Sequence, residues 1–188
     1  RWSRGWPLYT ADTVVGVLGL GAVGGECARK LAALGFQVHG WSRRHKYMVG
    51  VTCHNGADGL LKMAAQCRFL VCVLPLTSQT EGIINASLLA AMPAGGFVIN
   101  IARGGNLVDD DLLAALDSGH LGGAFLDVYN EEPLPPAHPY WHHHKVWMTP
   151  HVAGELVPRS CAKSVVSSIR LIEAGQPVPN LLDKVQGY

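Results

Sequence analysis

The sequence predicts an α/β fold built on a doubly wound parallel sheet. Short apolar runs alternate along the chain with stretches of helical character. The runs are bounded by glycine, proline or polar residues, which is typical of buried strands. The 188 residues, 48% of them hydrophobic, suffice for one well-buried domain. Together these features predict strand–helix–strand units whose helices cover both faces of one sheet.

Six apolar runs are predicted to be strands. Each is short, and several are rich in β-branched residues. In chain order they are Val14–Leu18, Phe36–Trp41, Phe69–Leu74, Phe97–Ile101, Gly123–Asp127 and Val146–Met148.

The stretches between these runs carry the signals of helix ends. A glycine follows the first predicted helix, over Ala22–Leu34, and a proline follows the second, over Ala86–Met92. Acids occupy the first turn of the third, over Asp109–Leu116. A fourth helix is predicted over Leu156–Ala174. Glu131–Pro139 is rich in proline and acid, and we expect an ordered loop there.

The bulk composition disfavours several classes of protein. A formal net charge of +1 lacks the basic excess of a nucleic-acid-binding protein. No apolar run approaches the ~20 residues that cross a bilayer. The cysteines are odd in number and form no C-x-x-C pair, which favours a reduced, cytosolic compartment. We expect each of them to be a small buried side chain: Cys27, Cys53, Cys67, Cys72 and Cys161.

The segment Gly19-Leu20-Gly21-Ala22-Val23-Gly24 fits the pattern G-x-G-x-x-G. It follows a predicted strand and opens a predicted helix, the context in which this pattern binds dinucleotides. Gly19 permits a tight turn, Gly21 lets the backbone approach a pyrophosphate, and Gly24 lets helix and strand pack closely. The N–H groups of the helix N-terminus complete the anion site. A glycine-rich turn without a ligand is the alternative, but the context favours a Rossmann-type dinucleotide-binding domain. We assign residues 1–154 to it, and residues 155–188 to a C-terminal helix and tail.

The second predicted strand runs into Ser42-Arg43-Arg44. This tip, about 20 residues after the glycine loop, normally carries an acid that bonds the ribose 2′-hydroxyl. A carboxylate would repel a 2′-phosphate, whereas a hydroxyl and guanidinium groups would bind one through charge-assisted hydrogen bonds. A solvated basic turn, extended by His45 and Lys46, is the alternative. The missing acid and the added arginines favour NADP(H) over NAD, and leave open which arginine contacts the phosphate.

Polar side chains also follow the ends of the later strands, where ligands bind in open α/β sheets. Arg103 follows one strand, Asp127 closes the next and His151 follows the last. Glu132 lies in the loop between the second and the third. Side chains that converge on one edge make a candidate catalytic site. His142-His143-His144 has no cysteine or acid at ligand spacing, so we expect a solvated loop there and no metal site.

Five motifs in order carry a family resemblance: V-L-G-L-G-A-V-G, L-P-L-T-S-Q-T, N-I-A-R-G-G, L-D-V-Y-N-E-E-P and T-P-H-V-A-G. Through them the chain, from Val14 to Tyr188, resembles the D-isomer-specific 2-hydroxyacid dehydrogenases. The W-S-R tip, E-P-L-P-P and the terminal G-Y are most similar to the glyoxylate/hydroxypyruvate reductase A type.

The resemblance implies a role for each catalytic candidate. Arg103 matches the arginine that binds the carboxylate and 2-oxo group of the substrate. His151 matches the acid/base that protonates the carbonyl oxygen as hydride arrives, and Glu132 matches the acid that orients this histidine and stabilises its protonated form. Asp127 matches the residue beside the nicotinamide. The other positions that match the cofactor pocket are Leu74, Pro75, Thr80, Ile101, Ala102, Arg103, His151 and Gly154.

The resemblance also implies a second, substrate domain, built largely from residues that would precede this chain. We expect Arg1–Asp12 to be only the approach to the first strand. The chain by itself is then expected to bind NADPH but to reduce 2-oxo acids poorly, because cleft closure completes the site. The full-length protein is expected to be a cytoplasmic homodimer without nucleic-acid or membrane partners. Its substrate would be glyoxylate, hydroxypyruvate or a related 2-oxo acid, reduced to the D-2-hydroxy acid.

Two other functions stay open. A transcriptional corepressor can use this fold as a cofactor-gated binding module and keep Arg103, Glu132 and His151. The tip Ser42-Arg43-Arg44 disfavours it, because that relative resembles NAD-binding members with an acid there. An NAD-dependent phosphoglycerate, lactate or formate dehydrogenase is the other alternative, and cofactor preference distinguishes it.

Overall fold

The computed structural model describes residues 8–154, 157–179 and 181. They form two compact units that divide between His151 and Val152. The first unit holds a seven-stranded sheet, and the second holds one long helix, α5 (Pro158–Glu173). The boundary expected after Gly154 stays a prediction. The predicted helix start at Leu156, most of the approach to the first strand and nearly all of the tail after residue 179 lie outside the described residues.

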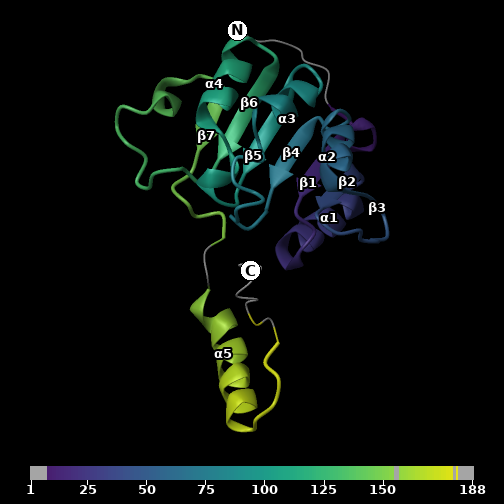
Figure 1. The fold of residues 1–188 in the computed structure, drawn as a ribbon, viewed down its shortest axis with the longest axis vertical. Helices are drawn as coiled ribbons and strands as arrows, with labels where there is room; N and C mark the ends of the chain where they lie inside the picture. Colours follow the sequence, from purple (N-terminus) through teal and green to yellow (C-terminus); the bar gives the residue numbers. More distant parts are fainter. Residues whose placement is uncertain (1–7, 155–156, 180, 182–188) are drawn as a thin grey trace. The chain divides into compact units, whose positions relative to one another are not determined.

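The sheet is entirely parallel, in the order β3-β2-β1-β4-β5-β6-β7 (Figure 1). Its strands are β1 (Val14–Leu18), β2 (Gln37–Ser42), β3 (Val51–Asn55), β4 (Phe69–Cys72), β5 (Gly96–Asn100), β6 (Leu121–Leu126) and β7 (Val146–Met148). The direction of strand order reverses between β1 and β4, so the carboxyl ends of these two strands border the crevice where such sheets bind ligands. The predicted fold class is confirmed, and all six predicted strands are present with ends shifted by no more than two residues.

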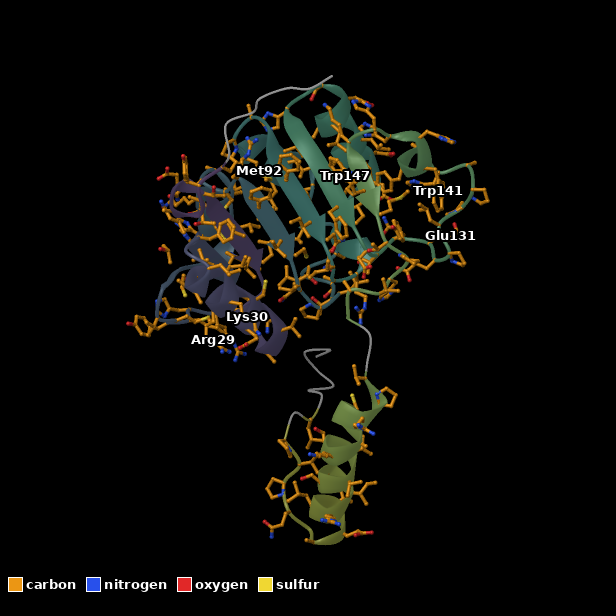
Figure 2. All side chains as sticks on the ribbon, turned by 180° about the vertical axis from the view of Figure 1, so that it is seen from behind. Arg29, Lys30, Met92, Glu131, Trp141 and Trp147 are labelled. Carbon is orange, nitrogen blue, oxygen red and sulfur yellow. The ribbon has the colours of Figure 1, made fainter. Side chains whose placement is uncertain are left out.

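Helices lie on both faces of the sheet. They are α1 (Ala22–Ala33), α2 (Gly56–Ala64), α3 (Ala86–Ala91) and α4 (Asp109–Asp117). In the view of Figure 1, α3 and α4 lie in front of the sheet, and α2 contacts α3, which contacts α4. Helix α1 contacts β1, β2 and β3, and in the reverse view of Figure 2 it lies on the near side. The main core is therefore between the sheet and α2, α3 and α4.

The core is made of aliphatic side chains from the central strands. Leu18, Leu70, Val98 and Leu126 are fully buried, one from each of β1, β4, β5 and β6. They pack with leucines of α3 and α4 in one continuous cluster. Each such side chain stabilises the fold by about 1.5–3 kcal/mol relative to its exposed state. This rigid sheet fixes the positions of the loops that follow its strands.

The outer strands leave aromatic side chains partly exposed on one face. Phe125 of β6 and Trp147 of β7 are 37% and 53% exposed. Phe69 and Phe97 stack nearby in the sheet, with ring centroids 5.4 Å apart. Figure 2 shows Trp147 on this side, where none of the described helices of the first unit lies over the outer strands. Within the first unit, this face is covered by α1 over β1, β2 and β3, and is apolar and partly exposed at β6 and β7.

One strand and one α-helix were not predicted. β3 is one of the two edge strands and pairs only with β2. Every side chain in it is at least partly exposed, and its sequence V-T-C-H-N has no continuous apolar run. Helix α2 starts at Gly56, with a φ of +70°, and contains a further glycine, which lowers its intrinsic helix propensity. Both elements are stabilised by packing on β2 rather than by local sequence.

Two expectations about individual side chains were wrong. Only Cys67 and Cys72 are buried, where burial raises the pKa of each thiol to about 12. The other three cysteines are half-buried. His143 is not solvated like its neighbours, because its side chain is 10% exposed and its Nε2 lies 3.2 Å from Asp117. Among the described residues, no helix is both long and apolar enough to span a bilayer.

Candidate active site

The glycine loop between β1 and α1 has the shape that a pyrophosphate requires. Gly19 has a φ of +100°, in the left-handed region that favours glycine. A Cβ at Gly24 would lie 1.8 Å from the carbonyl oxygen of Gly19, so only glycine permits this packing of helix and strand. A Cβ at Gly21 would meet nothing within 4 Å. Gly21 therefore faces open space, where a ligand can approach the backbone.

The first turn of α1 is open at the same place. Ala22 and Val23 are exposed to solvent, and Val23 is 70% exposed. The N-cap Gly21 provides no side-chain hydrogen bond to the helix N-terminus. The first N–H groups of a helix have no partners within it, so they and the dipole favour an anion. The loop and helix thus fit a dinucleotide phosphate.

Lys46 adds a positive charge to this loop. Its ammonium donates a hydrogen bond to the carbonyl oxygen of Leu20 at 2.6 Å. The sequence indicated only a basic turn at this position. The contact brings the segment after β2 onto the phosphate loop, which the linear spacing of the two did not reveal.

The tip of β2 has its own hydrogen bonds. The hydroxyl of Ser42 is mostly buried and donates to the carbonyl oxygen of Arg44 at 2.8 Å. Nη1 of Arg43 lies 2.6 Å from Oε1 of Gln79, on the loop after β4. Arg43 and Arg44 are both exposed. Ser42 therefore shapes the turn, and the two guanidinium groups lie at the surface where the sequence places a 2′-phosphate.

The loop after β4 is closed by a threonine. Oγ1 of Thr80 donates to the carbonyl oxygen of Pro75 at 2.6 Å and accepts from the amide of Thr77 at 2.9 Å. Asn106 donates to the carbonyl oxygen of Thr80 at 3.0 Å and so joins this loop to the one after β5. The remaining cofactor candidates of these two loops follow the neighbouring strand ends: Leu74, Ile101 and Ala102.

His151 and Glu132 form a hydrogen-bonded pair. Nδ1 of His151 lies 2.7 Å from Oε2 of Glu132. The other carboxylate oxygen accepts the amide N–H of Tyr129 at 2.9 Å. The hydrogen bond from His151 is the main cause that lowers the pKa of the Glu132 carboxyl; partial burial opposes it and the Tyr129 amide adds to it. Glu132 is therefore an anion at neutral pH, held at both oxygens.

The backbone at His151 is in an uncommon conformation. Its φ is +57°, and it is the one residue other than glycine with positive φ among those the structure describes. For an L-residue this costs about 1–2 kcal/mol. The segment before it is fastened to β6, because Thr149 donates its amide to Leu126 and the Tyr129 hydroxyl lies 2.9 Å from the Thr149 carbonyl oxygen. These contacts hold the strained turn that directs His151 towards Glu132.

Asp127 is close to the pair but almost completely covered. It is 1% exposed, and its Oδ1 accepts the hydroxyl of Thr149 at 2.5 Å. Its charge raises the pKa of the Glu132 carboxyl, against the larger effect of His151. The position beside the nicotinamide that the resemblance implies stays a prediction.

Arg103 lies at the same edge of the sheet as the pair. It follows β5, and the neighbouring strands β6 and β7 precede Glu132 and His151. Its side chain is exposed, and Nη1 donates to the carbonyl oxygen of Ala102 at 2.6 Å. A guanidinium has five N–H donors, so this bond leaves several for a substrate.

A pocket of roughly 610 Å³ opens beside His151 and Glu132. Its wall is mostly apolar and includes Trp141, which Figure 2 labels on the loop after β6. The lining residues are Tyr129, Glu132, Pro133, Leu134, Trp141, Met148, Thr149, Pro150 and His151. The pair thus borders a space large enough for a small organic molecule.

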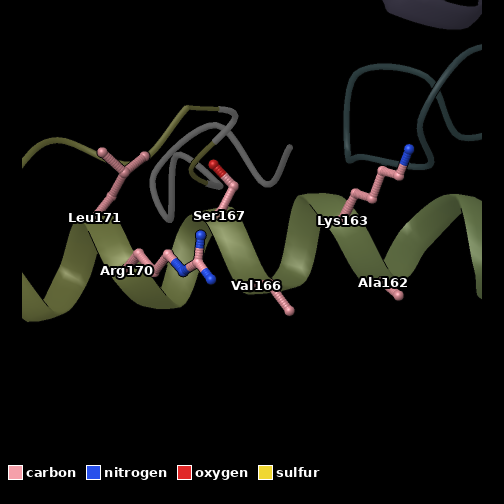
Figure 3. A pocket seen from close by; sticks show the side chains of 6 residues that line it. All are labelled: Ala162, Lys163, Val166, Ser167, Arg170 and Leu171. Carbon is pink, nitrogen blue, oxygen red and sulfur yellow. The ribbon is translucent and has the colours of Figure 1, made fainter.

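A second hollow runs along α5 (Figure 3). Its described lining is Ala162, Lys163, Val166, Ser167, Arg170 and Leu171, with no histidine or carboxylate for proton transfer. Nor do the described residues contain a group of histidine, cysteine and acid side chains that could hold a metal ion. Chemistry is therefore expected at the strand ends.

Comparison with known proteins identifies the family. Residues 2–153 match the NAD binding domain of the D-isomer specific 2-hydroxyacid dehydrogenases. The chain belongs to this family. A solved D-isomer specific 2-hydroxyacid dehydrogenase from Xanthobacter autotrophicus Py2, in complex with NADPH and MES, is 45% identical with a TM-score of 0.97. The match covers 100% of this chain and 78% of that one.

Other 2-hydroxyacid dehydrogenases superpose almost as closely. The NADPH-dependent glyoxylate/hydroxypyruvate reductase from Sinorhizobium meliloti, in complex with NADP and sulfate, is 43% identical with a TM-score of 0.94. A probable 2-hydroxyacid dehydrogenase from Rhizobium etli CFN 42, in complex with NADP, HEPES and L(+)-tartaric acid, is 34% identical with a TM-score of 0.92. Each match covers 100% of this chain, which spans 60% of either relative.

Within the family domain the structure brings some predicted residues together. His151 and Glu132 are in contact, and Arg103 follows the adjacent strand. Gly154 belongs to the second unit, so its part in cofactor binding stays a prediction. Sequence reasoning assigned no role to Tyr129, Thr149, Gln79 and Lys46. The first three lie within the family motifs, but the backbone and long-range contacts that all four make cannot be read from a local pattern.

Proposed function

We propose that the protein containing this chain reduces a small 2-oxo acid, glyoxylate or hydroxypyruvate, to the D-2-hydroxy acid with NADPH. The observation that carries the proposal is the contact of His151 with Glu132 beside a pocket. The pair follows the same edge of the parallel sheet as the open glycine loop. A proton donor and a dinucleotide cradle on one edge are the parts that a hydride-transfer enzyme requires.

His151 would supply the proton. Because Nδ1 faces Glu132, Nε2 is the ring nitrogen left to face a substrate. NADPH would provide the hydride for the carbonyl carbon. Nε2–H would protonate the carbonyl oxygen, so that C=O becomes CH–OH. The ionised Glu132 would stabilise the protonated ring before the transfer and keep it oriented.

Arg103 would bind the substrate. The adjacent oxygens of a 2-oxo acid, one from the carboxylate and one from the ketone, suit a planar fork of N–H donors. The exposed position of Arg103 after β5 supports this role. Charge-assisted hydrogen bonds from the guanidinium would also polarise the ketone towards hydride.

The cofactor assignment rests on the tip of β2. Arg43 and Arg44 are exposed there, in place of the acid of NAD-binding domains. The solved relatives that contain NADPH or NADP support the same choice. The expected homodimer and cytoplasmic location remain predictions; light scattering of the full-length protein checks the first, and fractionation the second.

The test is a steady-state assay of the full-length protein with a panel of small 2-oxo acids. We expect oxidation of NADPH with glyoxylate or hydroxypyruvate, and a preference for NADPH over NADH of at least about tenfold. A preference for NADH would instead favour an NAD-dependent dehydrogenase. Binding of NADPH without turnover of any 2-oxo acid would favour a cofactor-gated binding module.

A further inference from the structure

Glu132 lies on a long connection between β6 and β7 that contains little regular structure. The connection has only a short 3₁₀ turn, η3 (Pro139–His142), and four prolines. Its internal hydrogen bonds include those from Trp141 to Pro135 and from His138 to Pro135. A segment of this kind needs contacts with the rest of the fold to hold one conformation.

A single carboxylate fastens the connection on both sides of Glu132. Oδ2 of Asp109 accepts from Nδ2 of Asn130 at 2.9 Å, and Oδ1 accepts from the hydroxyl of Tyr140 at 2.9 Å. Nε2 of His138 lies 3.7 Å from the same carboxylate. Asn130 precedes Glu132 by two residues, so a bond that fixes Asn130 also restricts the backbone of Glu132.

The bond from Tyr140 is well shielded from water. Tyr140 is 2% exposed, and its ring lies 4.5 Å from that of His138. Burial, and then the charge of Asp109, raise the pKa of the phenol, which therefore stays a neutral donor. A hydrogen bond to a charged acceptor in such a place contributes more than one at the surface.

Asp109 itself is held by helix α4. It is the first residue of that helix, where a negative charge interacts favourably with the dipole. The helix is anchored because its Leu112 and Leu116 side chains are buried in the main core. Asp109 does not line the pocket beside His151. Its contacts with Asn130 and Tyr140 link it to the pair through the connection that carries Glu132.

We propose that Asp109 is a positioning residue of the active site, whose carboxylate holds the β6–β7 connection so that Glu132 meets His151. The kinetic part of this inference rests on the proposed function. The structural part does not, because the contact between Glu132 and His151 can be followed without turnover.

The test compares Asp109→Ala with Asp110→Ala in the full-length protein. Both remove an acid from the first turn of α4, but Asp110 is exposed and is not hydrogen-bonded to the connection. The probe is the carbon-13 resonance of the Glu132 carboxyl, identified by its absence in Glu132→Gln. The groups that act on this carboxyl are His151, Tyr129 and Asp127, and both variants keep all of them.

We expect Glu132 to titrate at higher pH in Asp109→Ala than in the wild type, towards its position in His151→Ala. Asp110→Ala should titrate like the wild type. For 2-oxo acid reduction, kcat should fall about tenfold or more in Asp109→Ala, because a small misplacement of a catalytic group is costly, with KM for NADPH unchanged. A change in stability alone would not move the titration.

An unchanged Glu132 titration in folded Asp109→Ala, or an equal shift in Asp110→Ala, would overturn the proposal. If Asp109→Ala does not fold, Tyr140→Phe replaces it as the test, because it keeps the buried ring and removes one hydrogen bond to Asp109. It should shift the Glu132 titration in the same direction. No shift in Tyr140→Phe would refute the proposal. Should the wild type reduce no 2-oxo acid while the titration still follows Asp109, the proposed function fails and the positioning role stands.

Discussion

Nδ1 of His151 lies 2.7 Å from Oε2 of Glu132, although the two residues come from different connections at the edge of the sheet. The contact depends on a left-handed backbone at His151 and on a carboxylate whose other oxygen accepts the Tyr129 amide N–H. An anion fixed against one ring nitrogen leaves the other nitrogen directed away from it. This is the arrangement of an oriented acid/base, and several measurements can test it.

The first prediction concerns the titration of Glu132. Its pKa is lowered below the ordinary value of 4.5, chiefly by the hydrogen bond from His151. Because the folded pKa is depressed, the pair stabilises the fold fully above the unfolded pKa and loses this contribution as pH falls through the folded value. His151→Ala should therefore move the Glu132 titration upward, as measured by carbon-13 NMR. The difference in unfolding free energy between the two proteins should shrink in the same acid range.

A second prediction uses the strained backbone at His151. Glycine adopts a φ of +57° without penalty, whereas alanine does not. His151→Gly should consequently be more stable to urea than His151→Ala by about 1 kcal/mol, the reverse of the usual order. If the alanine variant is as stable as the glycine variant, the turn is not strained as described.

Two glycines of the phosphate loop provide a third, matched comparison. Gly24→Ala would place a Cβ 1.8 Å from the Gly19 carbonyl oxygen, and should destabilise the fold by about 1–3 kcal/mol or more. Gly21→Ala adds a Cβ in open space, and should change the stability by no more than about 1 kcal/mol. It should nevertheless weaken NADPH binding about tenfold or more, because the Cβ obstructs the approach to the backbone. Fluorescence titration with NADPH measures this affinity. An affinity equal to that of the wild type in Gly21→Ala would contradict the role of the glycine loop in binding the pyrophosphate.

The arginines after β2 are the subject of a fourth prediction. Arg43→Ala and Arg44→Ala, singly and together, should weaken NADPH binding, with a loss of roughly tenfold or more for each arginine that contacts the 2′-phosphate. The affinity for NADH should change little. Arg29→Ala removes an exposed arginine of α1, paired with Glu26, and serves as the control. Unchanged NADPH affinity in the double variant would exclude the assigned 2′-phosphate site.

Much of the fold could be predicted because burial leaves a strong pattern in the central strands. Val14–Leu18 and Phe97–Ile101 are mostly apolar because they form central strands whose side chains are buried or half-buried, and Gly19 and Gly24 are needed by local geometry. The edge strand β3 has no such pattern, since V-T-C-H-N contains polar residues and all its side chains are at least partly exposed, whereas the other edge strand, β7, is apolar throughout. Edge elements of this kind depend on tertiary packing, which a local pattern does not report.

Part of the candidate site could likewise be predicted from the sequence, and part could not. The meeting of Glu132 with His151 was expected from motifs that follow adjacent strand ends. The contacts of Lys46 with Leu20 and of Asp109 with Tyr140 could not be expected, because they depend on the path of loops that carry no motif. The burial of Asp127 was equally unexpected, since it results from the later segment that places Thr149 over it.

The most direct test of the central claim is the rate of NADPH oxidation by full-length His151→Ala with glyoxylate or hydroxypyruvate, whichever the wild type reduces. The account predicts a fall in kcat by about 10²–10⁴-fold, because the substrate oxygen loses its proton donor, while the NADPH dissociation constant stays near that of the wild type. A His151→Ala variant that reduces the same 2-oxo acid at the wild-type rate would contradict it.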